Sequence, residues 1–177
     1  RREFIQQSAT LGIGLGLTAG LSSKAFASND KISVACIGVR GRGNSVMHSF
    51  ADEPDCEITH ICDVRESVRQ QRGAQIKQET GYMPQLVNDY RTLLNNPTID
   101  VFMVATPDHW HALLTIDGCL AGKDVYVEKP IANTVEECRV MVAAQERTGR
   151  VVQVGQWQRS GPHWADAIAF LRSGKLG

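Results

Sequence analysis

Apolar runs of strand length alternate with longer amphipathic stretches along the chain from residue 31 onward. Five of these runs are rich in valine and isoleucine, and a shorter one at 85–87 is a sixth candidate; the five span residues 32–38, 57–63, 100–106, 124–128 and 151–155. Such runs are typical of strands buried on both faces of a parallel sheet. Repeated strand–helix units with right-handed crossovers predict an α/β fold, a doubly wound parallel sheet with helices on both faces.

Helix signals lie between these runs. Thr134 forms a capping-box pattern with Glu137, and Gly149 stands where this helix should end. A second helix is predicted to begin at Asp108 and to end near Gly122. Its buried side is expected to carry Trp110, Leu113, Leu114 and Leu120. A last helix is predicted over about 162–173.

A glycine-rich turn follows the first apolar run. Gly38 ends that run, and Gly41 and Gly43 open a predicted helix over about 42–50. Asp63 ends the next run, 20 residues after Gly43. Glycines alone are weak support, but strand, turn, helix and distant acid in this order are typical of a dinucleotide site. The helix N-terminus would bind a pyrophosphate, and the acid would bind ribose hydroxyls and repel a 2′-phosphate, which predicts NAD rather than NADP.

An arginine, Arg40, occupies the place of the second glycine in this pattern. Two interpretations keep the nucleotide site. Either Gly41 takes over that role in a turn shifted by one residue, or Arg40 and Arg42 add positive charge to the phosphates. The alternative is a plain glycine turn without a ligand.

Three further segments stand at the ends of later strands: ATPDHWH (105–111), VEKP (127–130) and GQWQR (155–159). Ligands of open α/β sheets bind outside the carboxyl ends of the strands, so these segments should converge on one crevice. His109 and His111 are candidate metal ligands. They are two positions apart at a helix start and would point in different directions, and no third ligand is apparent, so no metal site is predicted.

Taken together, these motifs resemble those of the Gfo/Idh/MocA oxidoreductase family. The resemblance covers residues 31–177 and rests on IGVRGRGN, ICDV, ATPDHWH, VYVEKPIANTVEEC and VGQWQRSGPHWADAIAFLRSGKLG, of which E-K-P is the most specific part. It implies a Rossmann domain that binds NAD or NADP. It also implies a C-terminal α/β domain that holds the substrate and often mediates oligomers, which would begin near residue 177.

The resemblance also implies roles for single residues. Thr106 and Pro107 would line the cofactor ribose, His111 would lie near the nicotinamide, and Lys129 would be catalytic, often in a cis bond to Pro130. Outside E-K-P, such a lysine would be an ordinary solvated loop residue. With the two arginines, the predicted cofactor-binding residues are Gly38, Arg40, Gly41, Arg42, Gly43, Asp63, Thr106, Pro107, His111, Glu128 and Lys129.

The resemblance implies an NAD-dependent oxidoreductase that moves hydride between the nicotinamide and a sugar, cyclitol or related small molecule, with Lys129 as acid/base or proton relay. One alternative is a related branch that cleaves glycosides by transient oxidation beside the anomeric carbon; that branch replaces the lysine of E-K-P, so Lys129 favours the oxidoreductase. The other alternative is a non-enzymatic nucleotide-binding protein.

Residues 1–27 have the pattern of an export signal. Basic RREFIQQ is followed by an apolar run of 11 residues, LGIGLGLTAGL, and by AFA at 25–27. The arginine pair resembles the twin-arginine signal, with an ordinary secretory signal or an N-terminal helix as the alternative. The run is shorter than the roughly 20 residues that span a bilayer. We therefore expect a periplasmic bacterial protein without stable membrane insertion.

Composition sets further bounds. The 19 basic and 19 acidic residues balance, so there is no electrostatic footprint for nucleic acid. The five cysteines have neither disulfide-framework nor zinc spacing. We expect a Rossmann domain over 31–157, the start of a connection at 158–177, and a homo-oligomer formed through the second domain.

Overall fold

A six-stranded parallel sheet is the centre of the protein, seen here in a computed structural model that describes residues 31–176. The strands are β1 (Ile32–Ile37), β2 (Cys56–Cys62), β3 (Gln85–Val87), β4 (Val101–Val104), β5 (Asp124–Val127) and β6 (Val152–Val154). Their order is β3-β2-β1-β4-β5-β6, and every neighbouring pair is parallel. The order reverses between β1 and β4, which confirms the doubly wound α/β fold and places a crevice at the carboxyl ends of these two strands.

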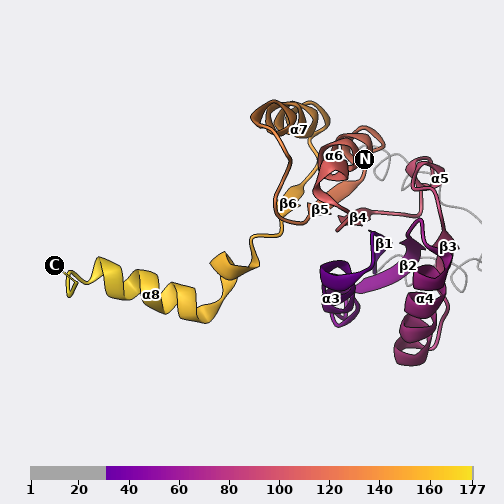
Figure 1. The fold of residues 1–177 in the computed structure, drawn as a ribbon, viewed down its shortest axis with the longest axis horizontal. Coiled ribbons are helices and arrows are strands. Elements are labelled where there is room, and N and C mark those ends of the chain that lie inside the picture. Colours follow the sequence, from indigo (N-terminus) through magenta and orange to yellow (C-terminus); the bar gives the residue numbers. More distant parts are fainter. Residues whose placement is uncertain (1–30, 177) are drawn as a thin grey trace, which may run out of the picture. The chain divides into compact units, whose positions relative to one another are not determined.

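Helices cover both faces of this sheet (Figure 1). They are α3 (Gly41–Ala51), α4 (Glu66–Thr80), α5 (Arg91–Leu94), α6 (His111–Leu120) and α7 (Val135–Thr148), with a short 3₁₀ turn η2 (Asp108–Trp110) before α6. A second 3₁₀ turn, η3 (Trp157–Ser160), leads to α8 (Pro162–Arg172), which buries no residue and does not cover the sheet. Residues of α3 and α4 pack on one face, and residues of α5, α6 and α7 pack on the other. The central strands β1 and β4 are mostly apolar and buried because helices cover both faces of the sheet there.

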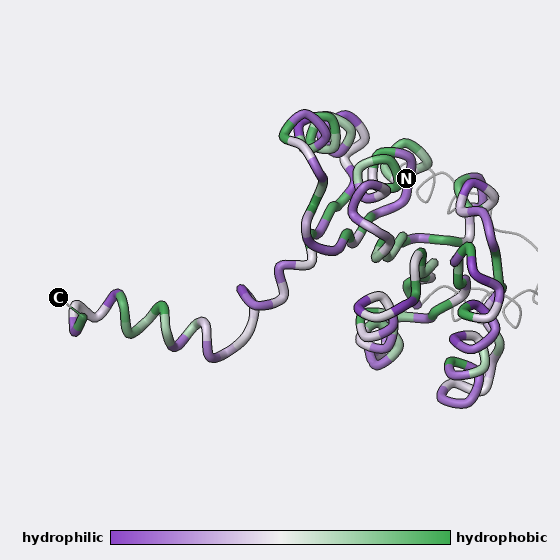
Figure 2. The backbone as a smooth tube through the Cα atoms, in the orientation of Figure 1, coloured by the Kyte–Doolittle hydropathy of each residue, from purple (hydrophilic) through white to green (hydrophobic). Residues whose placement is uncertain are grey.

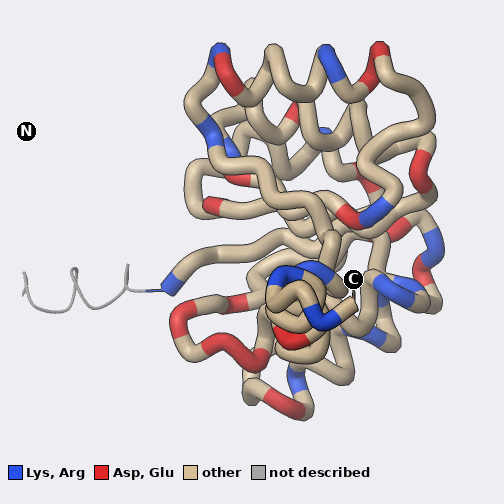
Figure 3. The backbone as a smooth tube through the Cα atoms, turned by 90° about the vertical axis from the view of Figure 1, so that its left-hand side faces the viewer, with Lys and Arg blue, Asp and Glu red and all other residues tan. Residues whose placement is uncertain are grey.

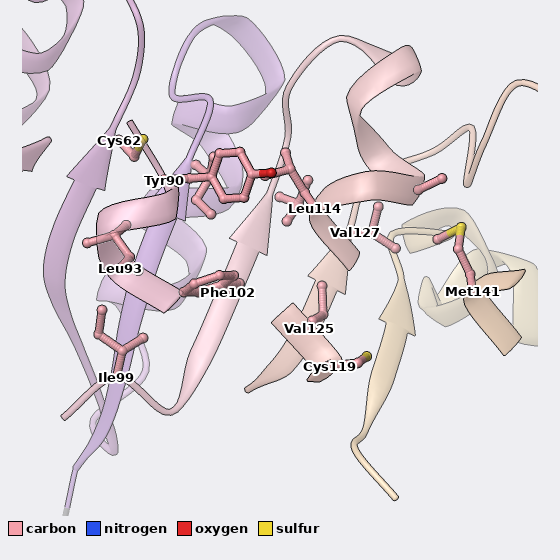
Figure 4. Packing of buried hydrophobic residues seen from close by; sticks show 14 of the residues in the cluster. Cys62, Tyr90, Leu93, Ile99, Phe102, Leu114, Cys119, Val125, Val127 and Met141 are labelled. Carbon is pink, nitrogen blue, oxygen red and sulfur yellow. The ribbon is translucent and has the colours of Figure 1, made fainter. Parts of the chain in front are cut away.

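The two layers have separate hydrophobic cores. Phe102 and Met103 are neighbours on β4, are both fully buried, and belong to opposite cores. This follows from the alternation of side chains along a strand. On the Phe102 side the core includes Leu114 and Met141 from the covering helices (Figure 4).

The predicted capping of α7 is confirmed. The Thr134 hydroxyl accepts a hydrogen bond from the Glu137 amide at 3.1 Å, and Glu137 Oε2 accepts one from the Thr134 amide at 3.2 Å. Gly149 ends the helix in the left-handed conformation, with φ of 64°. Local sequence rules therefore fixed both ends of this helix correctly.

The predicted buried side of α6 is largely wrong. Trp110, Leu113 and Leu120 are 38%, 42% and 51% exposed, and only Leu114 is buried. The helix instead packs through small residues: a Cβ added to Gly118 would lie 3.0 Å from Val125 and 3.2 Å from Phe102. Close approach to the sheet turns the larger apolar side chains outward.

The helix α4 was not predicted as a separate element. It is polar along most of its length, as the purple tube in Figure 2 shows, and its buried residues are Val68, Gly73 and Ile76. These three buried residues pack the helix against β2 and β3. The helix ends at Gly81, which has φ of 85°. Its sequence carries too weak an apolar stripe to identify it from periodicity.

Charged residues of both signs are interspersed around the periphery of the domain in the view of Figure 3. Among residues 31–176, no helix has the length and hydropathy needed to cross a bilayer. The predicted export signal at 1–27 lies outside the described residues.

Candidate functional site

The glycine turn between β1 and α3 is built so that only glycine fits its first position. Gly38 has φ of +79°, and a Cβ there would lie 2.7 Å from the Thr106 amide nitrogen. At Gly43, an added Cβ would collide with the carbonyl oxygen of Gly38. The first glycine thus lets the turn approach the end of β4, and the third lets α3 approach the turn.

The arginine in the turn now has a structural explanation. Arg40 lies just before α3 with φ of −95° and ψ of 160°, an extended conformation open to any residue. The positive φ instead falls on Gly41, at +45°. This geometry agrees with the first interpretation, in which the turn is shifted by one residue.

A cavity of about 810 Å³ lies over this turn at the carboxyl ends of the strands. From the predicted set it is lined by Gly38, Arg40, Gly41, Asp63, Thr106 and Pro107. Trp110, from the segment 105–111 expected at the crevice, also lines it. Sequence reasoning missed other lining residues, among them Val64, Arg65, Asn88, Asp89, Tyr90 and Arg91. Residues 88–91 follow β3, so the rule that ligands bind beyond strand ends could have found them.

Asp63 lies at the end of β2 and faces this cavity with both carboxylate oxygens partly engaged. Oδ2 accepts a hydrogen bond from the Val39 amide at 3.2 Å, and Oδ1 accepts one from the Arg65 amide at 3.0 Å. These bonds fix the carboxylate, and each oxygen keeps a lone pair for a ligand hydroxyl.

Two observations fit a dinucleotide in this cavity. The N-terminus of α3 lies at the turn and, among the described residues, receives no side-chain cap. In addition, the Oγ1 atom of Thr106 is buried and has no hydrogen-bond partner in the described part of the chain. A helix N-terminus suits a phosphate, and a buried hydroxyl of this kind needs a partner.

A smaller cavity of about 170 Å³ adjoins the same strand ends. It is lined by Arg42, Ala105, Thr106, Asp108, His111, Glu128, Lys129 and Pro130. Ala105 and Thr106 line both cavities, so the two cavities are neighbours at the end of β4. The E-K-P motif, which lines the small cavity, therefore lies close to the large one.

Glu128 is 3% exposed, and both oxygens of its carboxylate accept hydrogen bonds. Oε1 accepts hydrogen bonds from Arg42 Nε at 2.9 Å and from the Tyr126 hydroxyl at 3.0 Å. Oε2 accepts one from the Lys129 amide at 3.1 Å. Burial raises the pKa of Tyr126, and the neighbouring Glu128 carboxylate raises this pKa further. Gly155 makes room for the group, because a Cβ there would lie 2.5 Å from the Tyr126 hydroxyl oxygen.

The two arginines of the turn do not share a cavity. Arg40 lines the large cavity, whereas Arg42 lines the small one and forms the ion pair with Glu128. The Arg42 guanidinium also lies 5.5 Å from the ring centroid of Trp157, a cation–π contact. In this structure Arg42 connects the turn to E-K-P, a contact that sequence reasoning missed and that no spacing rule signals.

His111 joins two loops at the small cavity. It is 2% exposed, with Nδ1 2.6 Å from the Pro130 carbonyl oxygen and Nε2 2.8 Å from the Thr106 carbonyl oxygen. The Lys129–Pro130 bond is cis, as expected. Among residues 31–176, no three His, Cys, Asp or Glu side chains are arranged to hold a metal ion.

Comparison with known proteins gives a family match and several relatives. Residues 32–156 match the family model GFO_IDH_MocA, described as an oxidoreductase family with an NAD-binding Rossmann fold. A glycosyl hydrolase family 109 protein of Shewanella sp. (strain ANA-3) and an alpha-N-acetylgalactosaminidase of Shewanella oneidensis are each 30% identical over 200 aligned positions. These alignments cover 100% of this chain and 43% of each relative.

Among solved structures, this chain is similar to the aldose–aldose oxidoreductase of Caulobacter crescentus. The identity is 28% and the TM-score is 0.69, over 81% of this chain and 43% of the other. The chain thus spans less than half the length of these relatives, and the comparison concerns their Rossmann portion.

Proposed function

The chain belongs to the Gfo/Idh/MocA oxidoreductase family. From this premise we propose that it is the cofactor-binding part of an NAD-dependent oxidoreductase that acts on a sugar, cyclitol or derivative. The observation that carries the proposal is that the two cavities are neighbours and share Thr106 in their lining. A dinucleotide in the large cavity would extend towards Lys129 in the small one. Substrate would then approach the same small cavity.

The residues of the large cavity suit each part of NAD. The turn at Gly38 and the N-terminus of α3 would hold the pyrophosphate, and Asp63 would accept hydrogen bonds from the adenosine ribose hydroxyls. Arg40 would add positive charge beside the phosphates. The buried Thr106 hydroxyl would gain a partner on the ribose nearer the nicotinamide. When bound, the nicotinamide would accept or return a hydride.

Lys129 is the residue proposed to move the proton. Its side chain is exposed and lines the small cavity, so Nζ can take a proton from a substrate hydroxyl or return it. Glu128 is unsuited to that role because Arg42, Tyr126 and the Lys129 amide already occupy its carboxylate. We therefore assign Glu128 to positioning and Lys129 to acid/base chemistry.

The proposal is tested with the full-length protein and a panel of sugars and cyclitols, following NADH absorbance. We expect NADH to form with at least one carbinol substrate, and we expect dissociation constants lower for NAD than for NADP. Cofactor binding without turnover of any candidate, in either direction, would contradict the enzymatic part of the proposal.

A second candidate function is redox-assisted glycoside cleavage. It is favoured by the relatives named as family 109 glycosyl hydrolases and as an alpha-N-acetylgalactosaminidase. Chromogenic aryl glycosides distinguish it from the first candidate. Release of the aryl group with no net formation of NADH would support cleavage, whereas stoichiometric NADH without bond cleavage would support the dehydrogenase.

We further propose that the protein is exported with its NAD already bound. The support is the pattern of residues 1–27, because a twin-arginine signal exports folded proteins and the periplasm offers little free NAD. Retention would need a dissociation constant in the nanomolar range, roughly −12 kcal/mol. Protein purified from the periplasm without added nucleotide should release near-stoichiometric NAD(H) on denaturation. An empty site that turns over only with added NAD would contradict this.

A further inference from the structure

We propose that His111 is a positioning residue, whose protonated ring ties the loop carrying Lys129 to the end of β4. The inference rests on the proposed function, because it assigns His111 a part in the chemistry at Lys129. The imidazole is buried between two loops that no other described side chain joins in this way. Each ring nitrogen lies within hydrogen-bonding distance of a backbone carbonyl oxygen.

The two partners determine the protonation state that fits. A carbonyl oxygen only accepts hydrogen bonds, so a ring nitrogen must donate to bond with it. A neutral imidazole carries a single N–H group and can satisfy either Pro130 or Thr106. The other nitrogen would then direct its lone pair at an oxygen lone pair. The imidazolium form donates to both oxygens and leaves no mismatch.

The two bonds connect the parts of the site that must act together. The Pro130 carbonyl lies one residue beyond Lys129, and Thr106 lines both cavities. Both bonds end on backbone carbonyl oxygens and not on a side chain that could move a proton. His111 therefore acts through Lys129, by setting where the E-K-P loop lies relative to the end of β4.

Charged groups on the surrounding elements bear on the protonated ring. Arg42 of α3 and Lys129 line the same cavity and disfavour a further positive charge. Asp108 of η2 and Glu128 favour it, although Glu128 is already paired with Arg42 at 2.9 Å. The two carbonyl oxygens lie at 2.6 and 2.8 Å, and because a neutral ring can donate to only one of them, the second bond is specific to the protonated form of His111.

The first test does not depend on catalysis. In the full-length protein labelled with ¹⁵N-histidine, at about pH 6 and without cofactor or substrate, both ring nitrogens of His111 should give donor-type signals. The resonances are assigned by their loss in His111→Gln. A pyridine-like nitrogen at this pH would mean a neutral ring, and it would overturn the proposal whether or not the enzyme is active.

The second test separates positioning from general structural support. His111→Gln keeps one donor group but cannot carry charge, and we expect kcat to fall about 10-fold or more, since small misplacements of reacting groups are costly. The dissociation constant for NAD should change less than kcat does, by under about 3-fold. Equal losses of turnover and of NAD affinity, or normal turnover, would overturn the proposal.

The pH dependence of kcat distinguishes the proposed role of His111 from a purely structural one, because a purely structural role would not change the shape of the profile. Because the second bond exists only in the protonated form, its contribution to kcat is present at low pH and is lost once the ring is neutral. The unsubstituted protein should show this descending limb, and His111→Gln should lack it. His109→Gln is the matched control: His109 is exposed on η2 and lines neither described cavity, so its profile should keep the limb. A limb retained in His111→Gln contradicts the proposal.

Discussion

The large cavity is shaped mainly by backbone, whereas the small cavity beside it is shaped by charged side chains. Around the large cavity, the decisive features are the glycine turn, the N-terminus of α3 and the ends of the strands. Around the small cavity, they are the Arg42–Glu128 pair and the two bonds of His111. The backbone features of the large cavity come from the ends of four strands that chain order brings together, whereas the Arg42–Glu128 pair is a side-chain contact between residues 86 positions apart.

This difference in construction suggests different roles for the two cavities, cofactor binding for the large one and placement of the reacting group for the small one. Backbone groups in a turn bind any ligand of the right shape and charge, which suits a common cofactor. Side chains held in a buried network can place one reacting group accurately, but the network fails when a member is removed. We therefore expect substitutions around the small cavity to affect turnover, and substitutions around the large cavity to affect cofactor affinity or stability.

The largest effect is expected at Lys129. Lys129→Met removes the only proton-moving group assigned to the small cavity and should lower kcat of the full-length enzyme by about 10²–10⁴-fold. Affinity for NAD should change far less, because the substitution leaves the large cavity intact. Steady-state kinetics and cofactor titration measure the two effects.

Lys77→Met is the matched control for this substitution. Lys77 is exposed on α4 and lines neither described cavity. The control therefore loses the same positive charge at a position outside the site. Near-normal turnover in Lys129→Met would remove Lys129 from the mechanism. It would also contradict the assignment of turnover to the small cavity and of cofactor binding to the large one.

The next largest effect is expected at Gly43. An added methyl group would collide with the Gly38 carbonyl, so Gly43→Ala must displace the turn or α3. Overpacking of this kind costs about 1–3 kcal/mol, which corresponds to about 5- to 150-fold in the NAD dissociation constant if the cost falls on the bound turn. Isothermal titration provides the measurement.

Gly122→Ala separates this effect from ordinary backbone strain. Gly122 has φ of +77°, but nothing lies within 4 Å of an added Cβ, so alanine there should cost about 1 kcal/mol of stability and leave NAD affinity unchanged. If Gly43→Ala binds NAD normally, the close approach of α3 to the turn is not needed for cofactor binding.

The sequence predicted the backbone-built cavity better than the side-chain network, for a physical reason. Gly38, Gly41 and Asp63 follow strand ends, where chain order and local conformation place them. The pairing of Arg42 with Glu128 depends on how α3 and the E-K-P loop pack across the sheet. Spacing along the chain carries no signal for such a contact.

A second limit appears in α6. Its large apolar residues were expected to be buried, but the helix packs through Gly118 against Val125 and Phe102. Periodicity identifies an apolar stripe without showing whether large or small side chains form the interface. The structure has a helix here, but it begins at His111 and not at the predicted Asp108, because residues 108–110 form η2. Leu113 and Leu120, which were predicted to be buried, are exposed.

A smaller effect, on cofactor choice, is expected at Asp63. Asp63→Ser removes the negative charge that a 2′-phosphate would face, and should recover on the order of 1–2 kcal/mol of NADP binding. The ratio of the two dissociation constants should narrow by about 5- to 30-fold, with little change in kcat for NAD. Asp89→Ser, an acid elsewhere in the same cavity, tests whether the effect is specific to Asp63. Comparable constants for NAD and NADP in the unsubstituted protein would refute the assignment.

The smallest effect is expected at Tyr90, which lines the large cavity and donates a hydrogen bond from its hydroxyl to Asp117 at 2.7 Å. Burial, together with the hydrogen bond to the Asp117 carboxylate and its negative charge, raises the pKa of Tyr90 to about 12. A tyrosine in the unfolded chain ionises near pH 10, so between about pH 10 and 12 the folded state holds the extra proton. Stability from this group is therefore complete below about pH 10 and declines as the pH rises towards 12.

Tyr90→Phe should cost about 0.5–1.5 kcal/mol at neutral pH, the value of one hydrogen bond, and should make the alkaline decline shallower. The other tyrosines and the cysteines contribute equally to both proteins, so the difference between their urea-unfolding free energies at pH 8 and pH 11 isolates Tyr90. Turnover should stay near normal, because the residue lies away from the small cavity. An unchanged alkaline slope would show that the phenol is not held neutral in the folded protein, and a large loss of kcat would show that the two cavities are more tightly coupled than their construction indicates.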